Sequence, residues 1–180
     1  MTPFKIYFEL GKEHILDYAN GYDHILFIVA LCAIYLLSDW KRVLILVTAF
    51  TIGHSITLAL AVLNIIKVNT DLVEFLIPLT IFITAVTSIF KSEKSLSGGN
   101  VQINYAYALL FGLIHGLGFS AYLKSILGRQ TNILTPLFAF NVGLEVGQLI
   151  VVLLFLIAGY IAVNLIKVNR RDWKLVISSA

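Results

Sequence analysis

The sequence predicts an all-α protein built as a polytopic bundle of transmembrane helices. Of its 180 residues, 59% are hydrophobic and only 13% are charged, whereas about a quarter of a typical soluble domain is charged. The mean hydropathy is +0.91. The apolar residues are concentrated in five runs that are long enough to cross a bilayer, for which a helix needs about 20 residues. These observations exclude an ordinary soluble domain and make the lipid bilayer the first expected partner.

The five runs divide a single expected transmembrane domain, residues 1–180, into five spans and the start of a possible sixth. The last run is longer than one simple span, so its helix would tilt or extend beyond the lipid. Residues 1–20 are expected to form an outer interfacial segment, because a short helix there would present an apolar face. Residues 173–180 look like the opening of a sixth span. The five spans are expected at about 21–38, 43–66, 72–90, 105–127 and 133–166.

The distribution of positive charge predicts the orientation of the chain. Eight of the 13 Lys and Arg residues lie on the side of Lys41 and Arg42, and five lie on the side of Lys5 and Lys12. Because short loops rich in Lys and Arg stay in the cytoplasm, the first side is expected to be cytoplasmic and the N-terminus outside. The net charge of +3 reflects these helix ends and indicates no nucleic-acid partner.

Ionisable residues lie in or beside the apolar runs, where lipid should disfavour them. Such a group is costly at membrane depth, so its default interpretation is a functional site that faces the protein interior. Counted at about 1.5 Å per residue, His54, His115 and Glu145 fall within roughly 5 Å of one another along the membrane normal. Asp23 and His24 open the first span and could cap this cluster. We therefore predict that these five residues are the ligands of one metal site.

A second set of polar residues is expected to orient the ligands or to line the ion path. Asn141, Glu145 and Gln148 follow i, i+4, i+7 spacing and so form one polar stripe. Ser55 projects beside His54, and His14 is expected at the outer interface. A metal-bound imidazole needs an acceptor for its second nitrogen, which polar neighbours can supply. The predicted second set is therefore His14, Ser55, Asn141 and Gln148.

Each of these residues also has a purely structural interpretation. A single transmembrane His, Asn or Gln can hydrogen-bond across a helix interface, which would account for His54, His115, Asn141 or Gln148. Asp23 could cap the exposed N–H groups at the start of the first span. Glu145 is the hardest to explain in this way, because a lone carboxylate in lipid would have to stay protonated.

Several stretches of the sequence resemble the motifs of the HupE/UreJ family of membrane proteins, in the same order. The likeness runs from about residue 8 to residue 160. The stretches are GKEHI (11–15), GYDHILF (21–27), GHSITL (53–58), FGLIHGLGF (111–119) and FNVGLEVGQ (140–148). The resemblance implies a hydrogenase/urease accessory protein of the bacterial inner (cytoplasmic) membrane, regarded as a permease or binder for nickel. Its His and acidic residues would be the ligands, and a completed sixth helix would follow.

The ligand types alone leave the identity of the metal open. Imidazole suits zinc, nickel, copper and iron, and carboxylate is compatible with each, so nickel is implied only by the family resemblance. Cys32 is the only cysteine, which removes a C-x-x-C site and disfavours Cu(I). We therefore expect a divalent transition metal ion, bound or transported at an intramembrane site of His and carboxylate groups.

Two other functions fit the same residues. The first is an intramembrane metal-dependent hydrolase, because three His ligands with one open water position also make a catalytic zinc site. Glu145 or Asp23 would be the general base, and the substrate would be lipid or a membrane-borne peptide. The absence of an H-E-x-x-H sequence weakens the zincin version. The second is a metal store, sensor or assembly factor, which would have metalloenzyme assembly factors as partners.

Overall fold

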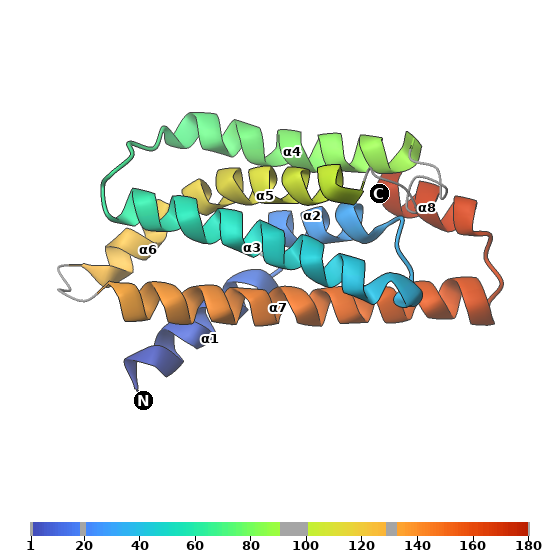
Figure 1. Ribbon diagram of the computed structural model, residues 1–180, viewed down its shortest axis with the longest axis horizontal. Coiled ribbons are helices and arrows are strands. Elements are labelled where there is room, and N and C mark those ends of the chain that lie inside the picture. The colour runs from blue at the N-terminus through green and yellow to red at the C-terminus, as the bar shows by residue number, and fades with distance from the viewer. Residues whose placement is uncertain (1, 19–20, 91–100, 129–132, 180) are drawn as a thin grey trace.

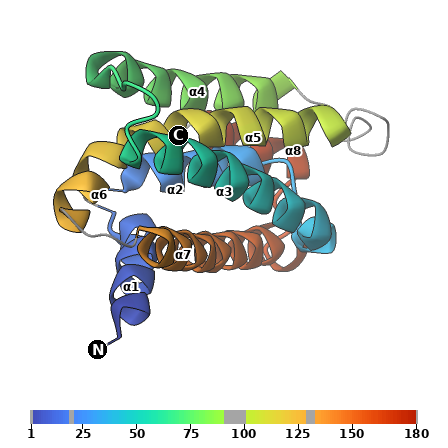
Figure 2. The same cartoon turned by 60° about the vertical axis from the view of Figure 1, so that its left-hand side comes forward.

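A computed structural model describes residues 2–18, 21–90, 101–128 and 133–179 of the chain. Within these ranges every regular element is helical, which confirms the predicted all-α class. The elements are α1 Pro3–Leu16, α2 Tyr22–Cys32, η1 Leu37–Asp39, α3 Trp40–Val62, α4 Thr70–Phe90, α5 Val101–Gly118, α6 Ser120–Leu127, α7 Leu134–Tyr160, η3 Ile161–Leu165 and α8 Arg170–Ser179. Figures 1 and 2 show α4 and α7 on opposite sides of the bundle, with α2 and α5 between them.

The prediction of five membrane spans is wrong for the described residues. Three helical segments are long and apolar enough to cross a membrane, at Leu37–Val62, Thr70–Phe90 and Leu134–Leu165. A fourth span would need α5 and α6 together, which are bent by 48° at their junction. The run 21–38 fails because α2 has only 11 residues. At about 1.5 Å per residue, such a helix covers little more than half of a hydrocarbon core about 30 Å thick.

Short helices lie near both ends of the chain, and the predictions of an outer interfacial segment and of a sixth span stay predictions. α1 lies obliquely across α7 and packs against it (Figure 1). Residues 173–179 belong to α8, a helix of 10 residues. α8 folds back toward the bundle, where the Trp173 ring lies 5.9 Å from that of Phe155 on α7.

Glycine residues allow α1 and α7 to approach at backbone distance. A Cβ atom added at Gly11 would overlap the carbonyl oxygen of Phe140, and one at Gly143 would overlap that of Phe8. Small residues at such a crossing let two helices pack closely within a membrane. The contact carries the C-terminal half of α1 into the bundle.

α3 and α5 are joined in the same way. A Cβ atom added at Gly53 would overlap the carbonyl oxygen of Leu109, and one at Gly112 would overlap that of Phe50. On the same face, Gly116 lies against the backbone of His54. The two glycine contacts, α1 with α7 and α3 with α5, fix the positions of three helices that bear a histidine, α1, α3 and α5.

Two apolar clusters fill the bundle on either side of the histidine residues. One joins α2, α3, α5 and α7 and includes Phe27, Phe50 and Phe111. The other joins α1, α3, α6 and α7 and includes Ile15, Leu58, Leu123, Phe140 and Leu144. Burial of apolar area contributes roughly 25 cal/mol per Å² only against water, so inside lipid the close packing of these side chains matters more.

Candidate metal centre

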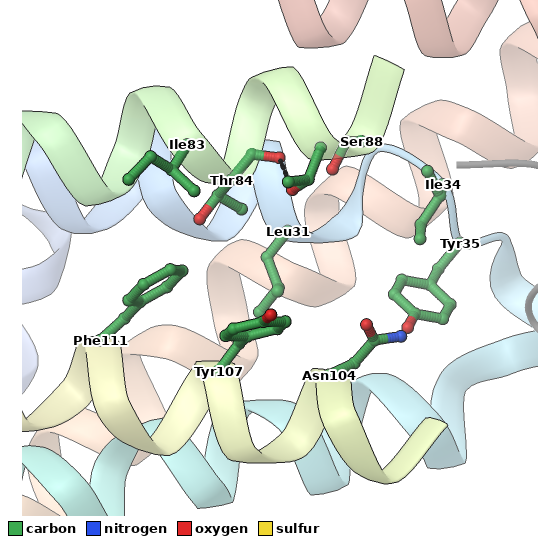
Figure 3. A pocket seen from close by; sticks show the side chains of 10 residues that line it. Leu31, Ile34, Tyr35, Ile83, Thr84, Ser88, Asn104, Tyr107 and Phe111 are labelled. Atoms are coloured by element: carbon green, nitrogen blue, oxygen red, sulfur yellow. Dashed lines mark hydrogen bonds between the residues drawn. The ribbon is translucent and has the colours of Figure 1, made fainter. Parts of the chain in front are cut away.

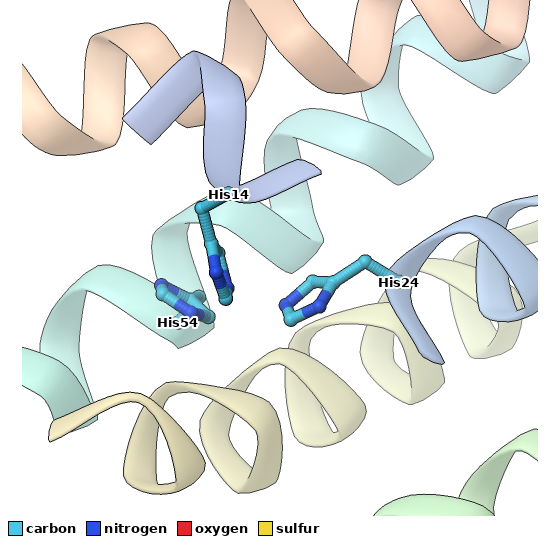
Figure 4. A group of neighbouring side chains, drawn as sticks. All are labelled: His14, His24 and His54. Carbon is cyan, nitrogen blue, oxygen red and sulfur yellow. The ribbon is translucent and has the colours of Figure 1, made fainter. Parts of the chain in front are cut away.

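His14, His24 and His54 form a close group of imidazoles at the centre of the bundle. They come from α1, α2 and α3, and Figure 4 shows the three rings turned toward one another. One ring nitrogen from each lies within 4.8 Å of the others. Nitrogens bound to one ion at about 2.1 Å in tetrahedral geometry are about 3.4 Å apart. Side-chain shifts of about an ångström would therefore close the group around an ion.

Several nitrogens of this group have no hydrogen-bond partner among the described residues. These are both ring nitrogens of His54 and Nε2 of His14 and His24. His54 is fully buried and His24 is 3% exposed. Buried polar atoms are almost always paired, and leaving one unpaired costs about 1–3 kcal/mol. Convergence of such atoms from three helices is the pattern expected of a set of metal ligands.

Asp23 determines which nitrogen of His24 is available. Its Oδ1 accepts a hydrogen bond from the His24 backbone N–H at 2.8 Å and lies 2.9 Å from His24 Nδ1. Because a carboxylate only accepts, Nδ1 carries the proton and Nε2 keeps its lone pair. A carboxylate behind a histidine is a common support for a metal ligand. Asp23 is thus placed to support His24, and the ligand role expected for Asp23 stays a prediction.

His115 presents its ring in the same way from α5. Its Nδ1 donates to the carbonyl oxygen of Phe111 at 2.9 Å, so Nε2 keeps a lone pair. That atom is buried and has no partner among the described residues. The His115 ring centroid lies 5.2 Å from that of His24. His115 is thus a fourth imidazole beside the group of three.

Glu145 and Gln148 lie in a polar layer with threonines of α3, outside the close imidazole group. The Thr48 hydroxyl donates to Glu145 Oε1 at 2.7 Å, and the Thr51 hydroxyl donates to Gln148 Oε1 at 2.7 Å. Ser55 Oγ donates to the carbonyl oxygen of Thr51 at 2.7 Å. A ligand role for Glu145 therefore stays a prediction, and the structure gives its carboxylate a different partner.

Asn141, on α7, lies next to His54. Its Nδ2 donates to the Leu137 carbonyl oxygen at 2.8 Å. Its side chain lies close to the His54 ring and interacts with it, although the geometry falls short of a regular hydrogen bond to Oδ1. The Asn141 carbonyl oxygen is therefore suited to accept from the second nitrogen of a metal-bound His54.

His14 was expected at the solvated outer interface, but the structure places it in the imidazole group. The glycine contact between α1 and α7 carries it inward. Its ring lies 3.9 Å from that of Phe119 and 6.0 Å from that of Phe140. Burial, followed by the neighbouring His24, lowers the pKa of His14 to about 3. At neutral pH the ring is therefore uncharged and able to bind a metal.

The end of α1 and the bend between α5 and α6 flank the imidazole group. α1 ends at Leu16 and α2 begins at Tyr22, after Gly21. Gly21 lies against the carbonyl oxygen of His14, where a Cβ atom would overlap. On the other side α5 gives way to α6 at Phe119 with the 48° bend. The group thus sits between the end of α1 and the bend between α5 and α6.

The pockets differ in whether their walls contain an imidazole or a carboxylate. A pocket of about 120 Å³ between α2, α4 and α5 is lined by apolar groups and by polar ones such as Tyr35, Ser88 and Asn104 (Figure 3). Its lining contains no His and no acid, so it offers no metal-ligand set. A cavity of about 420 Å³ between α1 and α6 includes His14 in its wall. A third, of about 600 Å³ between α2 and α4, includes Asp23.

Comparison with known proteins identifies a family. A family model described as HupE / UreJ protein matches residues 1–179. The match extends the resemblance from the quoted motifs to almost the whole chain. No curated protein and no solved structure shows a significant match.

Proposed function

Because the chain belongs to the HupE/UreJ family of membrane accessory proteins of metal-transporter type, we propose that it carries a divalent transition metal ion through a site of His14, His24 and His54. The observation that supports this proposal is the convergence of unpartnered, buried ring nitrogens from three helices within 4.8 Å. The family is associated with nickel and cobalt, and imidazole suits both ions.

The ligand set is suited to release as well as to binding. Transport requires a site strong enough to replace the hydration shell of the ion and weak enough to let it leave. Neutral imidazoles provide nitrogen ligands without thiolate, whose affinity for metals is higher. Cys32, the one thiol in the chain, is fully buried in the apolar cluster of α2, α3, α5 and α7. In this proposal His115 and Asn141 receive or orient the ion next to the three ligands.

The bent pair of helices α5 and α6 favours transport over simple storage. In many secondary transporters the substrate site lies near the bilayer midplane, beside discontinuous helices. The 48° bend between α5 and α6 gives a place where small backbone rotations could open a path. We propose the bacterial inner membrane as the location, with α1 and α6 toward the outer side.

The hydrolase alternative is not favoured by the site. Its expected general bases were Glu145 and Asp23, and each carboxylate already has a partner. Asp23 is hydrogen-bonded to His24, and Glu145 accepts the Thr48 hydroxyl. Neither is left as a free base beside the imidazole group.

The proposal is tested by calorimetric titration of detergent-purified protein with NiCl2 or CoCl2. His24→Ala and His54→Ala should each lower the affinity by about a hundredfold, because even loss of a supporting residue costs 10- to 100-fold. Glu145→Gln should change it by less than about threefold, because the amide oxygen can still accept from Thr48.

Thr84→Val is the matched control, since Thr84 is a buried polar residue of α4 away from the imidazole group. It should bind like the wild type. Wild-type affinity in both His variants would overturn the assignment. A tenfold loss in Glu145→Gln would instead make Glu145 a ligand, as the sequence predicts.

A further inference from the structure

We propose that the cavity between α1 and α6 is the vestibule through which a hydrated divalent cation reaches His14. This inference rests on the proposed function, since it names the route into that same site. The vestibule is lined by Leu10, Glu13, His14, Asp17, Phe119 and Tyr122. Its wall therefore combines two carboxylates with one of the three imidazoles.

The size of the vestibule suits an ion that still carries water. Its volume is about 420 Å³. A shell of about six waters occupies about 180 Å³, at about 30 Å³ for each water. A hydrated ion therefore fits, and the ion would lose its waters only when it passes from the vestibule to the imidazole nitrogens.

The vestibule leads directly to the buried ligand atoms. His14 belongs both to its wall and to the imidazole group. Beyond it, His24 and His54 are 3% and 0% exposed, with ring nitrogens that lack partners among the described residues. These buried nitrogens distinguish the vestibule from an ordinary acidic surface, because an ion that enters it meets a ligand set.

The charge on α1 is arranged to attract a cation at this place. Glu13 and Asp17 are four residues apart, so they lie on one face of the helix end. Glu9, one turn earlier, is neutralised by its ion pair with Lys12 and is not in the vestibule wall. The C-terminal end of α1 also lies here, and the carbonyl groups of a helix end favour positive charge. The negative potential is therefore concentrated on the vestibule.

The cavity between α2 and α4 is the competing route. It contains Asp23 and Glu74, but its other lining residues are apolar or aromatic, and no imidazole is among them. Asp23 is already hydrogen-bonded to His24. An ion entering by this route would meet a supporting carboxylate before any ligand, so the α1–α6 vestibule is the better entrance.

The vestibule is tested by the rate of Ni²⁺ association with purified protein in detergent, followed in a stopped-flow competition with a chromogenic chelator. Glu13→Gln and the double variant with Asp17→Asn should slow association, the double variant by about tenfold at low salt, because attraction by a charged cleft raises association rates by 10-fold or more. The difference should shrink at high salt. Binding stoichiometry should stay unchanged.

Two matched variants separate the routes. Glu9→Gln removes a carboxylate from the same helix outside the vestibule and should leave the rate unchanged. Glu74→Gln alters the competing cavity and should also have no effect. Hexaamminecobalt(III), an inert ion of similar size to a hydrated divalent cation, should slow Ni²⁺ association with the wild type and not with the double variant.

The outcomes keep this inference apart from the proposed function. If His54→Ala loses Ni²⁺ binding while the double variant associates at the wild-type rate, the vestibule is wrong and the metal site stands. If Glu74→Gln is the only variant that slows Ni²⁺ association, the entrance is the α2–α4 cavity instead. If the wild type binds no Ni²⁺ or Co²⁺ at equilibrium, the proposed function itself fails.

Discussion

At the scale of single residues, Asp23 determines which ring nitrogen of His24 faces the imidazole group. Its hydrogen bond to Nδ1 of His24 leaves Nε2 facing the imidazole group. Phe111 does the same for His115 through its carbonyl oxygen. The candidate centre therefore depends on acceptors placed behind the imidazoles as much as on the imidazoles themselves.

Asp23→Asn should lower the affinity for Ni²⁺ by about 10- to 100-fold, as is typical when the support of a metal ligand is lost. The amide can donate to Nδ1, which would favour the tautomer with its proton on Nε2. Calorimetric titration measures the change. Asp39→Asn is the control, because Asp39 pairs with Arg42 and does not contact the imidazole group. Equal affinity in the two variants would contradict the role assigned to Asp23.

At the scale of elements, the position of α1 depends on glycine contacts with α7. Gly11 and Gly143 allow the two backbones to touch, and this contact places His14 beside His24. α1 therefore belongs to the ligand-bearing part of the bundle, although it is not among the segments long enough to cross a membrane. The same logic holds for α3 and α5, where Gly53 and Gly112 set the depth of His54 and His115.

Gly11→Ala should lower the free energy of unfolding by about 1–3 kcal/mol, the usual cost of overpacking, and should weaken Ni²⁺ binding because His14 is displaced. Thermal unfolding in detergent and calorimetric titration measure the two effects. Gly159→Ala is the control, since a Cβ there would meet Trp173 at an ordinary 3.5 Å. If Gly11→Ala behaves like Gly159→Ala, the close contact between α1 and α7 is not what positions His14.

The whole molecule combines helices that are long enough to cross the bilayer with helices that are shorter or bent. α3, α4 and α7 are long enough to cross the bilayer, while α1, α2 and the bent pair α5–α6 meet around the imidazole group. The charge distribution predicts that the α3–α4 connection and α1 lie outside and that the start of α3 faces the cytoplasm. The α1–α6 vestibule and the α2–α4 cavity would then both open toward the outer half of the membrane.

This orientation can be measured by cysteine labelling in intact cells. The native thiol, Cys32, is buried and should not react, so the wild-type chain is a suitable background. Lys67→Cys should react with a membrane-impermeant maleimide from outside, because Lys67 lies in the α3–α4 connection. Lys41→Cys should react only after permeabilisation. The opposite pattern would place the vestibule on the cytoplasmic side.

The sequence by itself determined the class of the protein and the type of its chemistry. Hydropathy identified an all-α membrane protein, because the free energy of transfer to lipid is a local property that adds along the chain. The cost of ionisable groups in lipid indicated Asp23, His24, His54 and His115 as candidate site residues. In the structure the other three residues all lie close to His24.

Tertiary structure alone decided the number of spans, the inclusion of His14 and the separate position of Glu145. An apolar run has the same hydropathy whether it faces lipid or packs inside protein, so the short α2 and the bent α5–α6 pair could not be recognised from composition. Equal depth did not bring Glu145 to the histidines, because depth says nothing of the direction in which a side chain points. His14 reaches the group only through contacts between helices more than a hundred residues apart in the chain, and such contacts arise from packing in three dimensions.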